Sequence, residues 1–204
     1  MKRFLILIFF LVISGCASFQ TGGNENDKIS LPDMSNIRRS LKPSVTIEFI
    51  YKNNGMTISG DTSEYRDERR IWLDNFKKSE LFSRIVQWKR SGIFLDIELI
   101  KKGGKPQLGW KTVSELSFYL IPNFYTTEYE LKATVFDEIH KKAKEYRIKN
   151  RIINIEHLSL ALISPFFLPE DVDIKARRKL YDSLLKQMYK DGIVGEVKNK
   201  SFEK

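Results

Sequence analysis

The sequence predicts an α+β protein with an antiparallel sheet of about five strands and two main helices packed on one face of that sheet. Three observations support this fold class. Several segments alternate apolar and polar residues with the two-residue period of a half-buried strand. Two longer segments carry an apolar stripe with helical spacing. Their order along the chain is strand, helix, several strands and helix, which is typical of helices gathered on one side of a sheet.

The first residues have the layout of an export signal. The basic pair Lys2 and Arg3 precedes a run of ten apolar residues at 4–13. A membrane-spanning helix needs roughly 20 apolar residues, so this run is too short to remain as an anchor. We therefore expect it to be removed.

The only cysteine of the chain follows this apolar run. The sequence Ile13-Ser14-Gly15-Cys16 resembles the lipobox of bacterial lipoproteins. In that family the cysteine thiol is acylated with diacylglycerol and the signal is cut just before it. The resemblance implies cleavage after Gly15 and a lipid anchor on Cys16, which holds a protein durably once two or three acyl chains are present. The alternative is an ordinary signal peptide whose cysteine is incidental.

Composition divides the rest of the chain. Residues 16–43 are rich in Ser, Gly, Asn, Asp and Pro, and we predict a lipidated N-terminus and a flexible tether that lets the domain stand off the membrane. Residues 44–195 are predicted to form a single α+β domain, and residues 196–204 a frayed tail. Removal of residues 1–15 leaves 189 residues, which is enough for one domain.

The predicted domain begins with a strand and a helix. The apolar face of the strand consists of Val45, Ile47, Phe49 and Tyr51. A turn at 53–55 ends the strand, and a helix runs to about Lys77. Asp61 or Thr62 can cap the start of this helix, because Asp61 and Glu64 have capping-box spacing. Its apolar stripe is Tyr65, Trp72, Leu73 and Phe76.

The middle of the chain predicts further strands. Residues 81–86 lead into one strand, and residues 93–100 alternate in the next. The glycine pair at 103–104 ends that strand in a turn or loop. The stretch 110–121 is apolar-rich without a clean period, and we assign it as a strand. The remaining predicted strands are residues 129–135 and 146–152.

The last element has the clearest helical pattern, from near Pro169 to Asp191. Acidic side chains stand at its start, Lys190 lies near its end, and Gly192 follows, as the helix dipole and C-cap preferences favour. Its apolar side consists of Ile174, Tyr181, Leu184, Leu185 and Met188.

A weaker resemblance concerns the helix-to-strand unit. Residues 76–85 followed by 94–99 are similar to a unit of small periplasmic α+β lipoprotein domains, including auxiliary lipoproteins of envelope transport systems and the N-terminal domain of the TolB type. The resemblance covers about residues 45–100. In such domains the sheet serves as a contact surface, so the resemblance supplies no catalytic residue.

The residues needed for common catalytic chemistry are sparse. The chain has two histidines and no cysteine besides Cys16, which argues against a structural zinc site, even for the cluster Asp137, Glu138 and His140. Neither a G-x-S-x-G elbow nor a glycine-rich phosphate loop is present. We therefore expect no catalytic residue, no metal and no cofactor.

Positive charge is the next feature. Removal of Lys2 and Arg3 with the signal lowers the net charge from +9 to +7. The basic residues are concentrated in four segments, which are 38–42, 101–111, 141–151 and 177–190. A solvated basic face explains them most simply. The alternative is attraction to anionic lipid head groups or envelope polymers. Export argues against nucleic acid as a partner.

An uncharged run at 158–168 is the predicted contact site. It is too short to span a membrane, and the simplest interpretation is a buried segment that closes the core. If it is exposed, its end forms an apolar patch suited to a partner protein or to the bilayer interface. The residues of this candidate contact are Pro165, Phe166, Phe167 and Leu168.

Together these features predict a lipid-anchored protein of the bacterial envelope. It would act as a non-catalytic binding, assembly or transport accessory module, with the membrane and another envelope protein as partners. Ala17 stands where an aspartate would resemble an inner-membrane retention signal, which favours the outer membrane. The alternatives are a carrier of a lipid or amphiphile in a cavity and a cell-envelope hydrolase, which needs a cleft of polar groups with shifted pKa values.

Overall fold

The computed structural model describes residues 15–21, 30–31, 33, 42–86, 92–105, 108–137, 142–157 and 169–194. The predicted signal up to residue 14, most of the predicted tether, the candidate contact at 165–168 and the predicted tail at 196–204 lie outside these residues.

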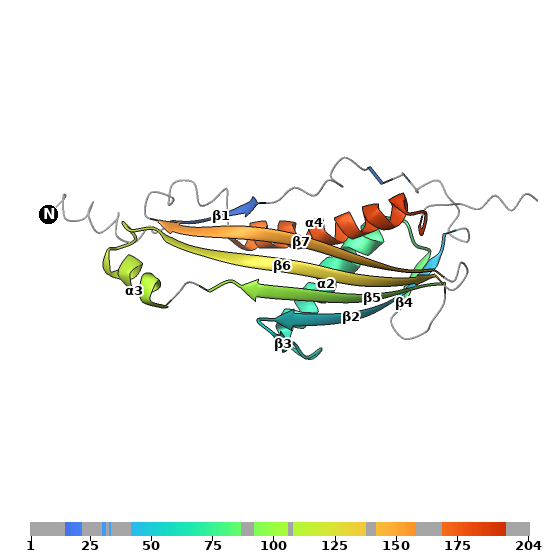
Figure 1. Cartoon of the computed structure of the whole chain (residues 1–204), viewed down its shortest axis with the longest axis horizontal. Coiled ribbons are helices and arrows are strands. Elements are labelled where there is room, and N and C mark those ends of the chain that lie inside the picture. The colour runs from blue at the N-terminus through green and yellow to red at the C-terminus, as the bar shows by residue number, and fades with distance from the viewer. Residues whose placement is uncertain are drawn as a thin grey trace, which may run out of the picture. The chain divides into compact units, whose positions relative to one another are not determined.

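The described chain is an α+β protein, as predicted (Figure 1). Its strands are β1 (Gly15–Thr21), β2 (Ser44–Asn53), β3 (Met56–Thr57), β4 (Arg84–Val86), β5 (Ile93–Gly103), β6 (Asn123–Asp137) and β7 (Lys142–His157). Its helices within the described ranges are α2 (Ser63–Lys78), α3 (Leu108–Leu116) and α4 (Pro169–Lys190). The strands form one seven-stranded sheet in the order β1-β7-β6-β5-β2-β3, and β4 also pairs with β2.

The prediction of about five antiparallel strands was wrong. β2 and β4 pair in parallel, with Val45 opposite Ile85, so the sheet is mixed. A parallel pair needs a long crossover connection, and α2 supplies it between these two strands. The strands missed by periodicity are the edge strand β1 and the two-residue β3, neither of which carries a long apolar alternation.

The chain divides into two compact units. The first unit comprises residues 1–22, 101–129 and 149–177, and the second comprises residues 23–100, 130–148 and 178–204. Periodicity contains no sign of this division, because β5, β6, β7 and α4 each contribute residues to both units.

The core of the second unit lies between one face of the sheet and its helices. The alternating side chains predicted for β2 and β5 are buried, and α2 and the part of α4 from Arg178 lie on the same side of the strands (Figure 1). The buried helical side chains of this unit are Ile71, Trp72, Phe76, Leu180, Tyr181, Leu184, Leu185 and Met188. Each large apolar side chain buried in this way stabilises the fold by about 1.5–3 kcal/mol.

Polar contacts fix the ends of these helices. Thr62 caps α2 by accepting a hydrogen bond from the Tyr65 backbone N–H at 3.2 Å. Glu64 does not form the capping box expected with Asp61, because its carboxylate accepts a hydrogen bond from the hydroxyl of Tyr51 at 2.8 Å. α4 ends at a left-handed Gly192, as its sequence predicted.

In the first unit, β1 is an edge strand built into the sheet. It pairs antiparallel with β7, so that Cys16 stands opposite Glu156 and Ser18 opposite Asn154. The buried Ser18 hydroxyl donates a hydrogen bond to the Asn154 side chain, which donates in turn to Thr127. β1 thus occupies residues for which composition indicated a tether. The sequence did not predict this strand because polar pairing of this kind leaves no trace in hydrophobic periodicity.

The strand predicted over residues 110–121 was wrong, since α3 and a turn occupy this stretch. α3 ends at Leu116, and Phe118 and Tyr119 in the turn after it are left-handed, so no single period can run through 110–121. In α3 the only buried residue is Ser114. None of the described helices is long and apolar enough to cross a membrane.

Candidate functional site

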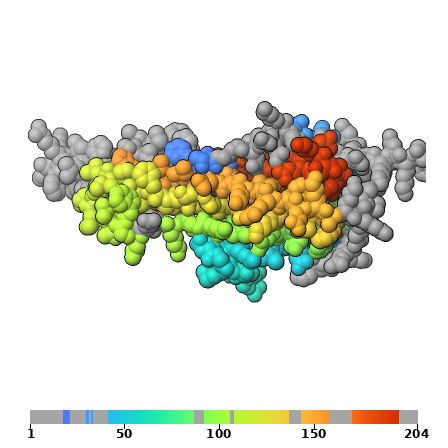
Figure 2. All heavy atoms as spheres, in the orientation of Figure 1, coloured from blue at the N-terminus to red at the C-terminus, as the bar shows by residue number. Residues whose placement is uncertain are grey.

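The most unusual surface of the described chain is the apolar end, a cluster of exposed apolar side chains on α3, on the turn after it and at the start of β6. It consists of Leu108, Trp110, Val113, Leu116, Phe118, Leu120, Ile121 and Phe124. These are eight of the eleven large exposed apolar side chains found among the described residues, so exposure is concentrated here. Figure 2 shows the green-yellow side chains of this segment at the surface.

Helix α3 has little packing of its own. It is nine residues long, and isolated helices shorter than about 12–15 residues are marginal in water. Leu108 is 84% exposed and Leu116 is 77% exposed. Full burial of side chains of this size would contribute about 1.5–3 kcal/mol each. Exposed apolar side chains concentrated in one segment are typical of a binding or membrane-contact site.

Polar side chains hold the backbone of the turn after α3. The buried Ser114 hydroxyl donates to the carbonyl oxygen of Ile121 at 2.7 Å. Ser117 Oγ donates to the Ser114 carbonyl oxygen at 2.8 Å and accepts from the Ile121 N–H at 3.1 Å. The indole N–H of Trp110 donates to the Pro122 carbonyl oxygen at 3.1 Å. These bonds satisfy the polar groups internally and leave the apolar side chains at the surface.

The same turn carries backbone strain. Phe118 and Tyr119 are consecutive non-glycine residues in the left-handed region, with φ values of 53° and 58°. Each such residue costs of order 1–3 kcal/mol, and strain of this kind is concentrated at functional sites. The side chain of Phe118 in this turn is 62% exposed.

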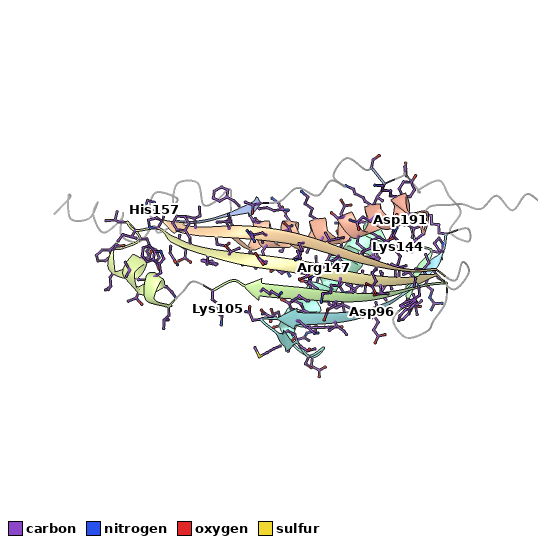
Figure 3. The ribbon with its side chains drawn as sticks, in the orientation of Figure 1. Asp96, Lys105, Lys144, Arg147, His157 and Asp191 are labelled. Carbon is purple, nitrogen blue, oxygen red and sulfur yellow. The ribbon has the colours of Figure 1, made fainter. Side chains whose placement is uncertain are left out.

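The apolar end adjoins the strand position of the predicted lipidation site. Gly15 and Cys16 pair with His157 and Glu156 at the end of β7. His157 Nε2 lies 3.1 Å from the carbonyl oxygen of Leu120, and Glu156 accepts a hydrogen bond from the Asn123 side chain at 2.8 Å. Both strand partners of Gly15 and Cys16 therefore contact the turn or the strand that follows it, and Figure 3 labels His157 beside that turn.

The basic segment 101–111 leads into the apolar end. Lys102, Lys105 and Lys111 are exposed, and Lys111 lies 3.5 Å from Glu115 in an ion pair along α3. Lys105 lies where the chain passes from β5 towards α3 (Figure 3). The basic segment 101–111 thus adjoins the apolar end in the first unit.

The second unit has a charged sheet face, opposite to the face covered by its helices. The side chains of this face are Lys52, Asp96, Glu98, Lys132, Glu145 and Arg147, and Figure 3 labels Asp96 and Arg147. All of them except Lys52 line a hollow of about 610 Å³. Glu98 lies 2.5 Å from Lys52 Nζ and 3.0 Å from Lys132 Nζ, and Arg147 forms an ion pair with Glu130 on β6.

Two carboxyl groups of the charged sheet face have pKa values shifted in opposite directions. The hydrogen bond from Lys52 and then that from Lys132 lower the pKa of Glu98, although partial burial opposes them. Burial raises the pKa of Asp96, and the nearby carboxylates of Glu48 and Glu98 raise it further. The two shifts thus have different causes, which are an ion-pair network for Glu98 and burial beside like charges for Asp96.

A third polar cluster joins the start of β7 to the end of α4. The Asp191 carboxylate accepts a hydrogen bond from Lys144 and from Tyr146, each at 2.7 Å (Figure 3). Burial and the neighbouring Asp191 raise the pKa of Tyr146. Burial works to raise the pKa of Asp191, but the hydrogen bonds from Lys144 and Tyr146 outweigh it and lower that pKa. The cluster ties a strand to a helix within the second unit.

A second hollow, of about 860 Å³, lies beside the start of α2. Its lining contains aromatic side chains and charged side chains of both signs, which are Phe49, Tyr65, Phe94, Arg66, Arg69, Glu48 and Asp61. Burial raises the pKa of the Tyr65 phenol, and the charge of Arg69 acts in the other direction.

The predicted site residues fall into two groups. Gly15 and Cys16 lie in β1, whereas the candidate contact Pro165, Phe166, Phe167 and Leu168 lies outside the described residues and stays a prediction. No group of metal-ligating side chains occurs among the residues that the structure describes.

Sequence reasoning missed the apolar end as a site. The signal that could have found it was a segment of large apolar residues without any period, which is unlike a strand or helix that packs against a core. A short helix followed by a left-handed turn also produces such a segment, and the structure has this arrangement at 108–121.

Comparison with known proteins gives no family for this chain. No protein-family description matches the sequence, and no curated protein matches it. Two crystal forms of the PelC dodecamer from Paraburkholderia phytofirmans, one of them a single-substitution variant, are 10% identical to this chain. They cover 83% and 82% of it and 96% of their own chains, with TM-scores of 0.30 and 0.31. At these values the likeness carries no argument about fold or function.

Proposed function

We propose that this chain is a lipid-anchored protein of the bacterial envelope that acts by contact rather than by catalysis, as a binding or assembly module. The lipobox-like sequence ending in Cys16 supports the anchor. The outer membrane is the proposed location, on the evidence of Ala17 after the cysteine. The apolar end supplies the contact surface.

The observation that carries this proposal is the concentration of exposed apolar side chains around α3. A surface of this kind is unfavourable in water and is typical of proteins that bind a partner or a membrane. Catalytic sites instead gather polar groups in a cleft. Hydrogen bonds from neighbouring side chains lower the pKa values of Glu98 and Asp191, and burial is the main cause of the raised pKa of Asp96.

Intact-mass analysis of the membrane fraction tests the anchor. We expect the wild-type chain to lose residues 1–15 and to gain the mass of two or three acyl chains, and Cys16→Ala to lack that added mass. An unacylated wild-type chain would contradict the proposal.

Photo-crosslinking tests the contact surface. A photoreactive phenylalanine analogue placed at Phe118 is expected to crosslink efficiently in intact cells, because this side chain is 62% exposed within the apolar end. The matched control carries the analogue at Met56, which is 68% exposed on β3 in the second unit. Equal crosslinking from both positions would argue against a specific surface.

The hollow beside α2 supports a second candidate, a carrier of an anionic amphiphile. Phe49 and Phe94 could contact an acyl chain while Arg66 binds the head group. Native mass spectrometry of the purified chain, before and after lipid extraction, tests this candidate. A bound lipid that is lost in Arg66→Glu would support it, and a lipid-free chain would exclude it.

A further inference from the structure

We infer that the apolar end is a bilayer-contact surface, which inserts into the interface of the same anionic leaflet that holds the acyl chains of Cys16. This inference rests on the proposed function, since it names the partner of the apolar end. It concerns the first unit alone.

The first argument is the position of the anchor in the fold. Cys16 is itself a residue of β1, and it pairs with Glu156 of β7. The part of the predicted tether that follows β1, residues 22–43, therefore adds no slack between the anchor and the first unit. The acyl chains must enter the bilayer close to the end of β7 that receives Cys16.

The second argument is what lies at that end. Glu156, the partner of Cys16, accepts a hydrogen bond from Asn123 at the start of β6. The next residue of β7, His157, lies 3.1 Å from the carbonyl oxygen of Leu120, in the turn that exposes Phe118 and Leu120. An anchor that brings this end to the bilayer also brings these apolar side chains to it. Contact with the bilayer then explains why these apolar side chains are exposed on the surface of the protein.

The third argument is the chemistry of the segment itself. α3 is a short helix with an apolar face, and its indole and lysine side chains are types that favour a membrane interface. Lys105 and Lys111 beside it can approach anionic head groups.

A second copy of the chain fits this surface less well. A two-fold contact would place the same patch against itself. Both copies would then bring the positive charge of segment 101–111 into one interface. An anionic leaflet accepts the same charges without that repulsion.

The test uses the full-length acylated chain with one environment-sensitive label. Acylation occupies the thiol of Cys16, the only native cysteine, so an introduced cysteine is the only free thiol. Leu116→Cys and Phe118→Cys place an NBD fluorophore on the apolar end, and Met56→Cys is the matched control at an exposed apolar residue of the second unit. The chains are reconstituted into phosphatidylethanolamine and phosphatidylglycerol vesicles that contain phosphatidylcholine brominated on its acyl chains.

We expect the brominated lipid to reduce NBD emission at least twofold at positions 116 and 118, and to leave it unchanged at position 56. Lys105→Glu with Lys111→Glu should weaken the quenching at 116 in these vesicles, but not in vesicles of phosphatidylcholine alone. Unquenched labels at 116 and 118, on chains that float with the vesicles, would overturn the inference. Crosslinked dimers through Phe118 without quenching would assign the surface to a second copy instead.

Failure of the anchor is a separate outcome. If intact mass shows no acylation, the proposed function fails at Cys16. The same labels, placed in a Cys16→Ala chain and measured with and without vesicles, still decide whether the apolar end inserts into lipid.

Discussion

At the scale of single residues, Glu98 shows how the charged sheet face is held together. Its carboxylate bridges Lys52 and Lys132, and its pKa is lowered mainly by the hydrogen bond from Lys52. A lowered folded-state pKa gives stability that is present above the unfolded-state pKa and is lost as the pH falls through the folded-state value. The contribution of Glu98 is therefore greatest at neutral pH.

We predict that Glu98→Gln lowers the free energy of unfolding by about 1 kcal/mol at pH 7, the size expected for partly exposed ion pairs. The difference from wild type should shrink as the pH falls below about 4. Urea unfolding at several pH values measures it. Glu145→Gln, in the same hollow, is the control. An effect of equal size at every pH would contradict the ion-pair explanation.

Asp96 is predicted to behave in the opposite way. Burial, then Glu48 and then Glu98 raise its pKa, so folding favours its protonated form. This contribution is present below the unfolded-state pKa and is lost as the pH rises through the folded-state value. We expect Asp96→Asn to stabilise the chain at pH 7, by less than about 1 kcal/mol. Loss of stability at pH 7 in the same urea series would contradict it.

At the scale of elements, the sequence predicts best where one face is buried. β2, β5, α2 and α4 were recognised because their buried side chains recur with a strand or helix period. β1 was missed because the polar side chains of Ser18 and Asn154 hold it in place. α3 was missed because it has almost no buried face. Hydrophobic periodicity predicts elements that have one buried apolar face. It does not predict elements that are held by polar contacts or that are mostly exposed.

The connection from β5 to α3 depends on a glycine that was predicted only as part of a turn or loop. Gly103 has φ of 79°, and a Cβ atom there would lie 2.3 Å from the carbonyl oxygen of Thr126. Both the backbone conformation and the close approach of β6 therefore require glycine.

We predict that Gly103→Ala lowers the free energy of unfolding by about 1–3 kcal/mol. Gly109→Ala is the matched control, because a Cβ atom at Gly109 meets nothing within 4 Å and alanine favours a helix. It should leave stability unchanged or raise it by up to about 1 kcal/mol. Thermal unfolding followed by circular dichroism compares the stability of the two variants. Equal losses of stability would show that neither the close contact with Thr126 nor the positive φ of Gly103 decides the effect.

At the scale of the whole molecule, the sequence predicted the α+β class, which the structure confirms, and a lipid anchor and a contact at 165–168, which stay predictions. It did not predict that the side chains of the apolar end are exposed. The predicted contact at 165–168 and the apolar end are both apolar runs beside a helix. The apolar side chains of a contact surface are exposed, whereas those of a core are buried. Tertiary packing decides between the two, and composition alone does not predict that packing. The structure describes this exposure for the apolar end alone.

The proposed attachment combines two interactions with different dependence on salt. Acyl chains are held by the hydrophobic effect, whereas Lys105 and Lys111 act on anionic head groups over a Debye length, which falls from about 10 Å at 0.1 M salt to about 3 Å at 1 M. Raising the salt between these limits should therefore leave flotation of the acylated chain unchanged. Quenching of a label at Leu116 by brominated lipid should decrease over the same range. If flotation and quenching decrease together, the acyl chains do not hold the molecule; if neither changes, the basic segment contributes nothing to the orientation of the first unit on the membrane.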